Sequence, residues 1–198
     1  MENLLELLGP DRELDFTEFG HETVENHPFN TIRLRNVIQT VKAGSDWGRE
    51  LPDGHGMGIA AQFSFLSYVA AVVEVAVDDD GLWRVPRVDI AIDCGQFVNP
   101  DRVYAQQEGS VIFGLSLARE GEITAEKGRI QQSNFHDFPV LRMDMAPLVA
   151  TYLVENEFPP SGVGEPGVPP VAPALANAIF AATGKRFRDL PLGAKLEL

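Results

Sequence analysis

Residues 59–92, IAAQFSFLSYVAAVVEVAVDDDGLWRVPRVDIAI, decide the fold of this 198-residue chain. The segments 59–64, 68–77 and 82–92 have patterns typical of β-strands, and the second is rich in valine. The sequence DDDG at 78–81 suits a tight hairpin, because glycine tolerates positive φ and aspartate bonds to nearby backbone. Its aspartates lack the ordered spacing and the bidentate glutamate of a calcium-binding EF-hand loop, so we expect a solvated turn. The stretch therefore predicts a meander of three strands.

Helices are predicted on both sides of this meander. Helical patterns occupy residues 1–8, about 30–44, 100–119 and 170–182, and one further strand is expected at 149–154. Asn99 is a good cap for the third helix, Pro100 suits its first turn, and Asp101 complements its dipole. Together these elements predict an α+β fold in which a mixed or antiparallel sheet packs against helices, with an amino-terminal helical segment.

A break rich in glycine and proline at residues 45–58 marks a boundary near residue 50. We therefore divide the chain into a helical amino-terminal segment, 1–50, and an α+β domain, 51–198. Further along, residues 121–128 have turn character, and residues 130–135 are expected to be extended.

Acidic residues outnumber basic ones, with 29 Asp and Glu against 16 Lys and Arg and a net charge of −13. Such a surface repels phosphate backbones, so we expect no nucleic-acid partner. The single cysteine, Cys94, excludes an intramolecular disulfide and a cysteine-ligated iron–sulfur or zinc site within the chain. The four histidines, His21, His27, His55 and His136, show no ligand spacing, so we assign them surface or packing roles and assign no metal ligand.

Glu165 is a carboxylate in an unusual setting. It lies in FPPSGVGEPGVPP, residues 158–170, where Pro166 fixes the backbone and the glycines leave room around the side chain. The loop precedes the positive end of an apolar helix. A carboxylate held there with little neighbouring charge is expected to be desolvated, which raises its pKa and makes it a competent base. On this local evidence alone, an ordinary surface turn remains the alternative.

Two glycines fall inside the predicted helix 100–119. Gly109 and Gly114 each cost about 1 kcal/mol relative to alanine. Either a close approach by another backbone or ligand, or tight helix packing alone, explains such residues.

Several separated motifs occur in an order that resembles a known family. They are DCGQFVNP at 93–100, QQEG at 106–109, FGL at 113–115 and GEP at 164–166. This pattern resembles the carboxy-terminal part of the large subunit of molybdenum hydroxylases, the family of xanthine dehydrogenase and aldehyde oxidase. Within that family, residues 134–143 and 162–185 are most similar to isoquinoline 1-oxidoreductase.

The resemblance implies a molybdenum cofactor, carried by molybdopterin and often extended to a cytosine dinucleotide. It implies that Glu165 is the general base when water-derived oxygen is added to an electron-poor carbon of an N-heterocycle or aldehyde. Gln106 matches the glutamine that contacts the cofactor, and Gly109 and Gly164 would let the cofactor approach. We read Asp93, a strand-end carboxylate, mainly as structural.

The resemblance also implies partners. The earlier segments that grip the pterin in such large subunits are not recognisable here, so we expect the amino-terminal part of the large subunit to complete the site. Iron–sulfur centres are expected only in a separate small subunit. Apolar surface left uncovered predicts self-association of this chain. An inactive assembly module that retains the fold is the alternative. No export signal is recognisable at the amino terminus, so the compartment is not assigned.

Overall fold

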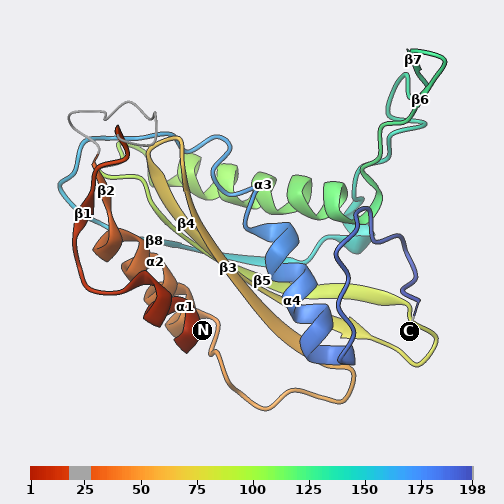
Figure 1. The fold of residues 1–198 in the computed structure, drawn as a ribbon, viewed down its shortest axis with the longest axis horizontal. Coiled ribbons are helices and arrows are strands. Elements are labelled where there is room, and N and C mark those ends of the chain that lie inside the picture. Colours follow the sequence, from red (N-terminus) through yellow and green to blue (C-terminus); the bar gives the residue numbers. More distant parts are fainter. Residues whose placement is uncertain (18–27, 198) are drawn as a thin grey trace.

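The protein is built on a four-stranded β-sheet with helices on both faces (Figure 1). The computed structural model describes residues 1–17 and 28–197. In chain order the elements are α1 (Glu2–Leu8), β1 (Glu13–Leu14), β2 (Phe29–Asn30), α2 (Thr31–Gly44), β3 (His55–Ser64), β4 (Ser67–Val77), β5 (Trp83–Asp93), α3 (Pro100–Glu120), β6 (Ala125–Glu126), β7 (Arg129–Ile130), a 3₁₀ turn (Met143–Met145), β8 (Leu148–Leu153) and α4 (Val171–Thr183). The helices and the four main strands expected from the sequence are confirmed, and only their ends differ.

The sheet has the strand order β3-β4-β5-β8 and combines antiparallel with parallel pairing. β3, β4 and β5 form the antiparallel meander predicted from residues 59–92. β8 is parallel to β5, and the register runs from Arg87 opposite Leu148 to Ile92 opposite Leu153. Parallel neighbours need a long crossover, which is supplied here by the segment that contains α3. The predicted α+β fold with a mixed sheet is confirmed.

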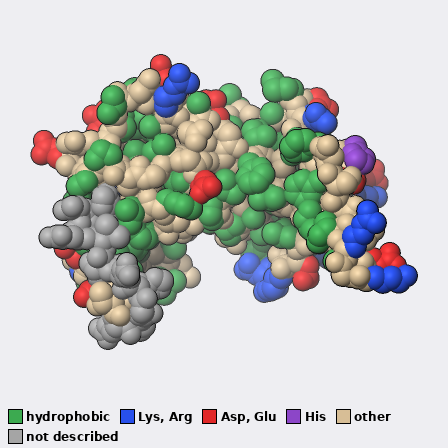
Figure 2. All heavy atoms as spheres, turned by 90° about the horizontal axis from the view of Figure 1, so that it is seen from above, with side chains coloured by type: hydrophobic (Ala, Val, Ile, Leu, Met, Phe, Trp, Pro, Cys, Tyr) green, Lys and Arg blue, Asp and Glu red, His purple; other side chains and the backbone are tan. Residues whose placement is uncertain are grey.

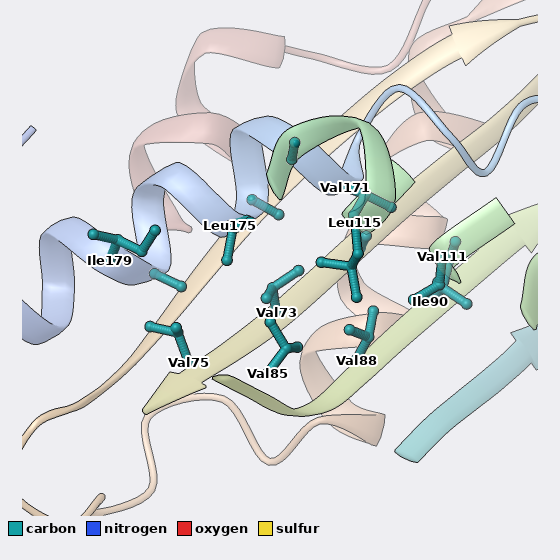
Figure 3. Close-up of a cluster of buried hydrophobic side chains, with 14 of the residues drawn as sticks. Val73, Val75, Val85, Val88, Ile90, Val111, Leu115, Val171, Leu175 and Ile179 are labelled. Carbon is teal, nitrogen blue, oxygen red and sulfur yellow. The ribbon is translucent and has the colours of Figure 1, made fainter. Parts of the chain in front are cut away.

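Alternate residues of β4 belong to two hydrophobic cores on opposite faces of the sheet. The core under α3 and α4 includes Val73, Val75, Val88, Ile90, Leu115, Leu175 and Ile179 (Figure 3). The core under α2 includes Val37, Ile38, Val41, Tyr68, Ala70 and Val72. Because both faces of β4 are covered, its sequence is apolar almost throughout instead of alternating.

The amino-terminal helix α2 is part of this packing. Asn30 caps it by accepting a hydrogen bond from the backbone N–H of Ile32 at 2.9 Å. The helix lies against β4 and β5 on the face opposite α4. Helix α2, within the first fifty residues, therefore covers one face of the sheet, and a domain division near residue 50 remains a prediction.

Glycines of β3 let α4 approach the sheet closely. A Cβ on Gly58 would collide with the carbonyl oxygen of Ala174, and Gly56 has a similar contact further along the helix. Asn177 of α4 donates a hydrogen bond to the carbonyl of Ile59 at 3.1 Å. These contacts fix α4, and with it the loop that precedes it.

Residues 121–147 connect α3 to β8, and we call them the arm. The part that carries β6 and β7 projects from the body (Figure 1), whereas Leu141 packs against the core under α3 and α4. β6 and β7 form a small antiparallel hairpin at the tip of the arm, with positive φ at Lys127 and Gly128. The turn predicted at 121–128 therefore includes the first strand of a hairpin. The extended conformation predicted for 130–135 is wrong at residues 134 and 135, which form a bend and the start of a turn, whereas residues 131–133 have no regular element.

The side chain of Asp137 explains that difference. Its carboxylate accepts hydrogen bonds from the backbone N–H groups of Ser133 and Asn134, with distances of 2.9–3.0 Å. These backbone donors hold the pKa of Asp137 below its ordinary value. The segment is thus folded into a turn by one aspartate, a local contact that competes with strand formation.

Two of the histidines can be placed. His55 lies 3.1 Å from Glu74 through its Nδ1 atom, and His136 is an exposed residue 3.5 Å from Asp137. Both have the ordinary roles expected of them, whereas His21 and His27 lie outside the described residues.

No helix within residues 1–17 and 28–197 is long and apolar enough to cross a membrane. The most apolar helix, α4, has 13 residues and is about 20 Å long, shorter than the hydrocarbon core of a bilayer.

Candidate functional site

The amino-terminal half of α3 and the loop 158–168 meet at one face of the molecule. The side-chain nitrogen of Gln106 lies 3.4 Å from the position that a Cβ on Gly164 would occupy. Gln106 and Glu165 are exposed, and Gly164 is exposed with them. The structure therefore brings three of the residues predicted for the site to one exposed surface.

Four side chains hold this loop from beneath by donating hydrogen bonds to its carbonyl oxygens. They are Ser67 to Gly162 at 2.6 Å, Gln107 to Val163 at 3.2 Å, Ser110 to Gly164 at 3.5 Å and Gln62 to Pro166 at 2.8 Å. The donors come from β3, β4 and α3. Because the loop carbonyls on both sides of Glu165 are directed into the fold, its backbone has a fixed course.

The start of the loop is held by the end of β5. The backbone N–H of Gln96 donates to the carbonyl of Phe158 at 2.9 Å, and that of Ser161 donates to Cys94 at 2.9 Å. Gly95 has φ of 70°, and a Cβ there would collide with the carbonyl of Pro159. The motif at 93–100 thus shapes the backbone that leads to Glu165.

A buried ion pair secures this junction. Asp93 and Arg33 are only 1% and 2% exposed, and the guanidinium binds both carboxylate oxygens. Asn156 donates to Asp93 at 2.8 Å, and the backbone N–H of Gly95 donates at 3.0 Å. Asp93 is therefore structural, as predicted. Burial raises the pKa of the neighbouring Cys94 thiol, so Cys94 is a small buried residue and not a reactive one.

Glu165 differs from the prediction in one respect. Its side chain is exposed, and no hydrogen bond or ion pair to it is found in the described part of the chain. The described part of the chain therefore does not shield the Glu165 carboxylate from water, in contrast to what the loop sequence predicts. If Glu165 is desolvated, another polypeptide or a bound group must cover it.

The two glycines of α3 have different surroundings. A Cβ on Gly114 would lie 2.8 Å from the Cβ of Val171, so helix packing explains this residue. A Cβ on Gly109 would meet no atom within 4 Å. Gly109 and Gln106 are three residues apart on α3 and both are exposed, so they lie on one helix face.

Hydrophobic side chains gather on the side of the molecule that carries α3, whereas most charged side chains lie toward its ends (Figure 2). The exposed hydrophobic residues near the site are Phe65 at the β3–β4 turn, Val98 before α3, and Tyr104 and Phe113 on α3. Exposed apolar residues around a site are typical of a face that contacts other protein or a ligand.

Among residues 1–17 and 28–197, no three His, Cys, Asp or Glu side chains gather as a metal-binding group. The exposed groups at the site are instead a neutral amide, a carboxylate and glycine backbone. Such groups can bind an organic cofactor by hydrogen bonds.

Comparison with protein families identifies the domain. The family described as the molybdopterin cofactor-binding domain matches residues 12–147, which include the DCGQFVNP motif, Gln106 and Gly109. This chain belongs to that family. The resemblance to molybdenum hydroxylases is thereby confirmed, and Gly164 and Glu165 follow the matched part of this molybdopterin cofactor-binding domain.

Curated relatives of this molybdopterin cofactor-binding domain are larger proteins. It is 40% identical over 160 residues to the beta chain of isoquinoline 1-oxidoreductase of Brevundimonas diminuta, covering 79% of this chain and 20% of that protein. It is 37% identical over 131 residues to a nicotinate dehydrogenase subunit of Pseudomonas putida, covering 65% of this chain and 11% of that protein. The chain thus spans about a fifth of the first of these relatives and less of the second.

Solved structures share the fold. The aldehyde oxidoreductase of Desulfovibrio desulfuricans superposes with a TM-score of 0.57 at 29% identity, covering 65% of this chain and 15% of that one. Quinoline 2-oxidoreductase of Pseudomonas putida 86 superposes with a TM-score of 0.56 at 20% identity, covering 65% of this chain and 17% of that one, which supports the fold alone.

The side chains that hold the loop were not predicted from the sequence. Gln107 and Ser110 lie at helical spacing with the buried Val103, Val111 and Leu115 of α3. Polar residues within an apolar stripe need hydrogen-bond partners when the stripe is buried. That departure from the pattern was the available signal, although it could not identify the loop as the partner.

Proposed function

We propose that this molybdopterin cofactor-binding domain is a carboxy-terminal module of a molybdenum hydroxylase large subunit, with Glu165 as its general base. The reaction would add water-derived oxygen to an electron-poor carbon of an N-heterocycle or aldehyde. The observation that supports the proposal most is that Gln106 and the Gly164–Glu165 segment share one exposed face in a chain of this family.

The residues present fit such a cofactor. The open space at Gly109 leaves room for a group to approach α3 closely. The exposed Gln106 amide can donate and accept hydrogen bonds without adding charge beside an anionic group. We assign the cofactor contacts to Gln106, Gly109 and Gly164, and assign no metal ligand to this chain.

Glu165 and its surroundings would carry the proton transfer. When bound, a molybdenum–pterin cofactor supplies the two-electron oxidation that the hydroxylation requires. The carboxylate of Glu165 would accept the proton released as oxygen is transferred. The four hydrogen bonds beneath the loop keep the backbone that carries Glu165 at a constant position, which would limit the reorganisation needed during the reaction.

The proposal requires partners that cover the exposed face. The amino-terminal part of the large subunit would exclude water from Glu165 and supply the other side of the cofactor, a molybdopterin with or without the cytosine dinucleotide extension. An iron–sulfur small subunit would remove electrons, since the single cysteine of this chain, Cys94, is buried and cannot ligate a cluster alone.

The test is to co-express the chain with the amino-terminal part of the large subunit and the iron–sulfur subunit. Oxidation of quinoline-type and aldehyde substrates is then measured for the unaltered enzyme, for Glu165→Gln and for Glu157→Gln. Glu157 is exposed, lies just before the same loop and gives the same change of charge. We expect Glu165→Gln to lower kcat by about 100-fold or more, with unchanged molybdenum content, and Glu157→Gln to retain activity.

Two results would contradict the proposal. Full kcat in Glu165→Gln would remove this residue as the base. An assembled enzyme that contains no molybdenum and oxidises none of these substrates would instead support an inactive assembly module.

A further inference from the structure

Gln107 is a fully buried polar residue beneath the candidate site. Its exposed fraction is 0%, although its neighbour Gln106 is exposed. Successive residues of an α-helix point about 100° apart, so one glutamine lies on the outer face of α3 and the other faces the loop. The side-chain nitrogen of Gln107 donates to the carbonyl oxygen of Val163 at 3.2 Å.

The same amide also touches the other side of the loop. A Cβ on Gly167 would lie 2.5 Å from the side-chain oxygen of Gln107 and 2.7 Å from the Cβ of Ser110, so a side chain here would displace the amide. Val163 and Gly167 are the residues two before and two after Glu165. One side chain therefore contacts the loop on both sides of the proposed base.

The side-chain oxygen of Gln107 adds nothing to stability among the described residues. This oxygen is buried and has no hydrogen-bond partner among the described residues. A buried acceptor without a partner is unfavourable, and an apolar side chain of similar shape would avoid that cost. The amide of Gln107 thus provides a hydrogen bond to Val163 through its nitrogen but also buries an oxygen that has no partner. An arrangement with this cost points to a role beyond packing.

We propose that Gln107 is a positioning residue for Glu165, an inference that rests on the proposed function. By holding the Val163 carbonyl on the inner side of the loop, it directs Gly164 and Glu165 outward beside Gln106. Gln107 does not contact cofactor or substrate. It acts through the loop backbone, whose next carbonyls are held by Ser110 and Gln62.

Gln107→Met tests this role, because methionine has a similar length but cannot donate to Val163. The matched control is Thr151→Val in β8, since the hydroxyl of Thr151 is also buried without a partner among the described residues and lies on another element. Thr151→Val removes an unpaired buried oxygen, and in Gln107→Met the same gain offsets the loss of the hydrogen bond to Val163, so in the assembled enzyme we expect each to change Tm by no more than about 3 °C. Only Gln107→Met removes a hydrogen bond to the loop.

The first readout does not depend on activity. Hydrogen exchange is measured by mass spectrometry on the assembled subunits. In Gln107→Met we expect peptides that cover residues 160–168 to exchange at least about 10-fold faster than in the unaltered enzyme, whereas peptides from β4 and β5 are unchanged. In Thr151→Val the loop should exchange at the unaltered rate. An unchanged loop in Gln107→Met would overturn the proposal.

The second readout separates positioning from simple destabilisation. We expect Gln107→Met to lower kcat by about 10-fold or more, while KM and molybdenum content remain within about twofold of the unaltered values. A loosened loop with unchanged kcat would also overturn the proposal. Should Gln107→Met fail to assemble, Gln107→Asn replaces it, because its shorter side chain keeps an amide but holds it about one methylene further from Val163.

The outcome for Gln107 is distinguishable from the outcome for the proposed function. Full activity in Glu165→Gln would refute Glu165 as the base, whatever the loop exchange shows. Reduced activity in Glu165→Gln together with normal loop exchange and normal kcat in Gln107→Met would refute only the positioning role.

Discussion

The guanidinium of Arg33 and the carboxylate of Asp93 form a buried ion pair with two hydrogen bonds of 2.9 and 2.6 Å. It joins α2 to the end of β5, although the two residues belong to segments that the sequence divides near residue 50. The guanidinium also lies over the rings of Tyr68 and Phe158, at 4.6 and 4.4 Å from their centroids. One arginine thus links the amino-terminal helix, the sheet and the start of the loop that carries Glu165.

Arg33→Met should strongly destabilise the chain. Removal of one member of a buried pair leaves the other charge without compensation, which costs about 3–5 kcal/mol. Arg35→Met is the control, because the Arg35–Asp11 pair is more exposed and such pairs contribute about 0–1 kcal/mol. Urea denaturation measures the free energy of unfolding that each variant loses relative to the unaltered chain. Equal losses would show that burial of the Arg33–Asp93 pair has no special role.

Gly109→Ala should stabilise the 198-residue chain by about 0.5–1 kcal/mol, because alanine is the better helix former and its Cβ would meet no atom. Gly114→Ala should destabilise the chain, since its Cβ would press against Val171. In the assembled enzyme, the added methyl group at Gly109 should lower the molybdenum content. An unaltered content would show that the cofactor does not approach Gly109.

Alkaline pH should weaken the fold. Burial raises the pKa values of Tyr68, Cys94 and Tyr152 above their ordinary values of 10.0, 9.0 and 10.0. The unfolded chain therefore loses these protons first, so their contribution to stability is complete below about pH 9 and is lost as the pH rises through the folded-state pKa values. The urea midpoint should be lower at about pH 10.5 than at about pH 8. Tyr68→Phe should reduce this difference between the two urea midpoints. An equal difference in the variant would show that the Tyr68 hydroxyl does not contribute to the loss of stability at alkaline pH.

The chain alone should self-associate through the face that carries α3. Phe113 is 49% exposed there, together with the other apolar residues near the site. Light scattering over a wide concentration range should show a mass that rises with concentration, and Phe113→Glu should reduce the rise. A clean monomer at every concentration would exclude this behaviour.

Local chemistry made much of the fold predictable. The meander at 59–92 follows from the strand patterns of its three segments, and Asn99 caps α3 by accepting from the N–H of Asp101 at 3.1 Å, as expected. Gly114 has the helix-packing role that was one of two alternatives for it. These features depend on a few consecutive residues or on one helix face, which a sequence displays directly.

Features made by distant residues were not predictable. The parallel pairing of β8, the partner of Asp93 and the hydrogen bond from Gln107 to Val163 all join segments far apart in the chain. The exposure of Glu165 was also unexpected, because a glycine-rich loop says nothing about what covers it. In such cases the three-dimensional contact, and not local propensity, decides the environment of a residue.

The parallel pairing of β5 with β8 constrains the order of events during synthesis. The hairpins β3–β4 and β4–β5 join neighbouring segments and can form while the chain is still leaving the ribosome. β8 cannot take its place until α3 and the arm have been translated, and the Glu165 loop follows β8. The candidate site is therefore completed only after β8, so a nascent chain that stops before this loop presents Gln106 without the carboxylate proposed to work beside it.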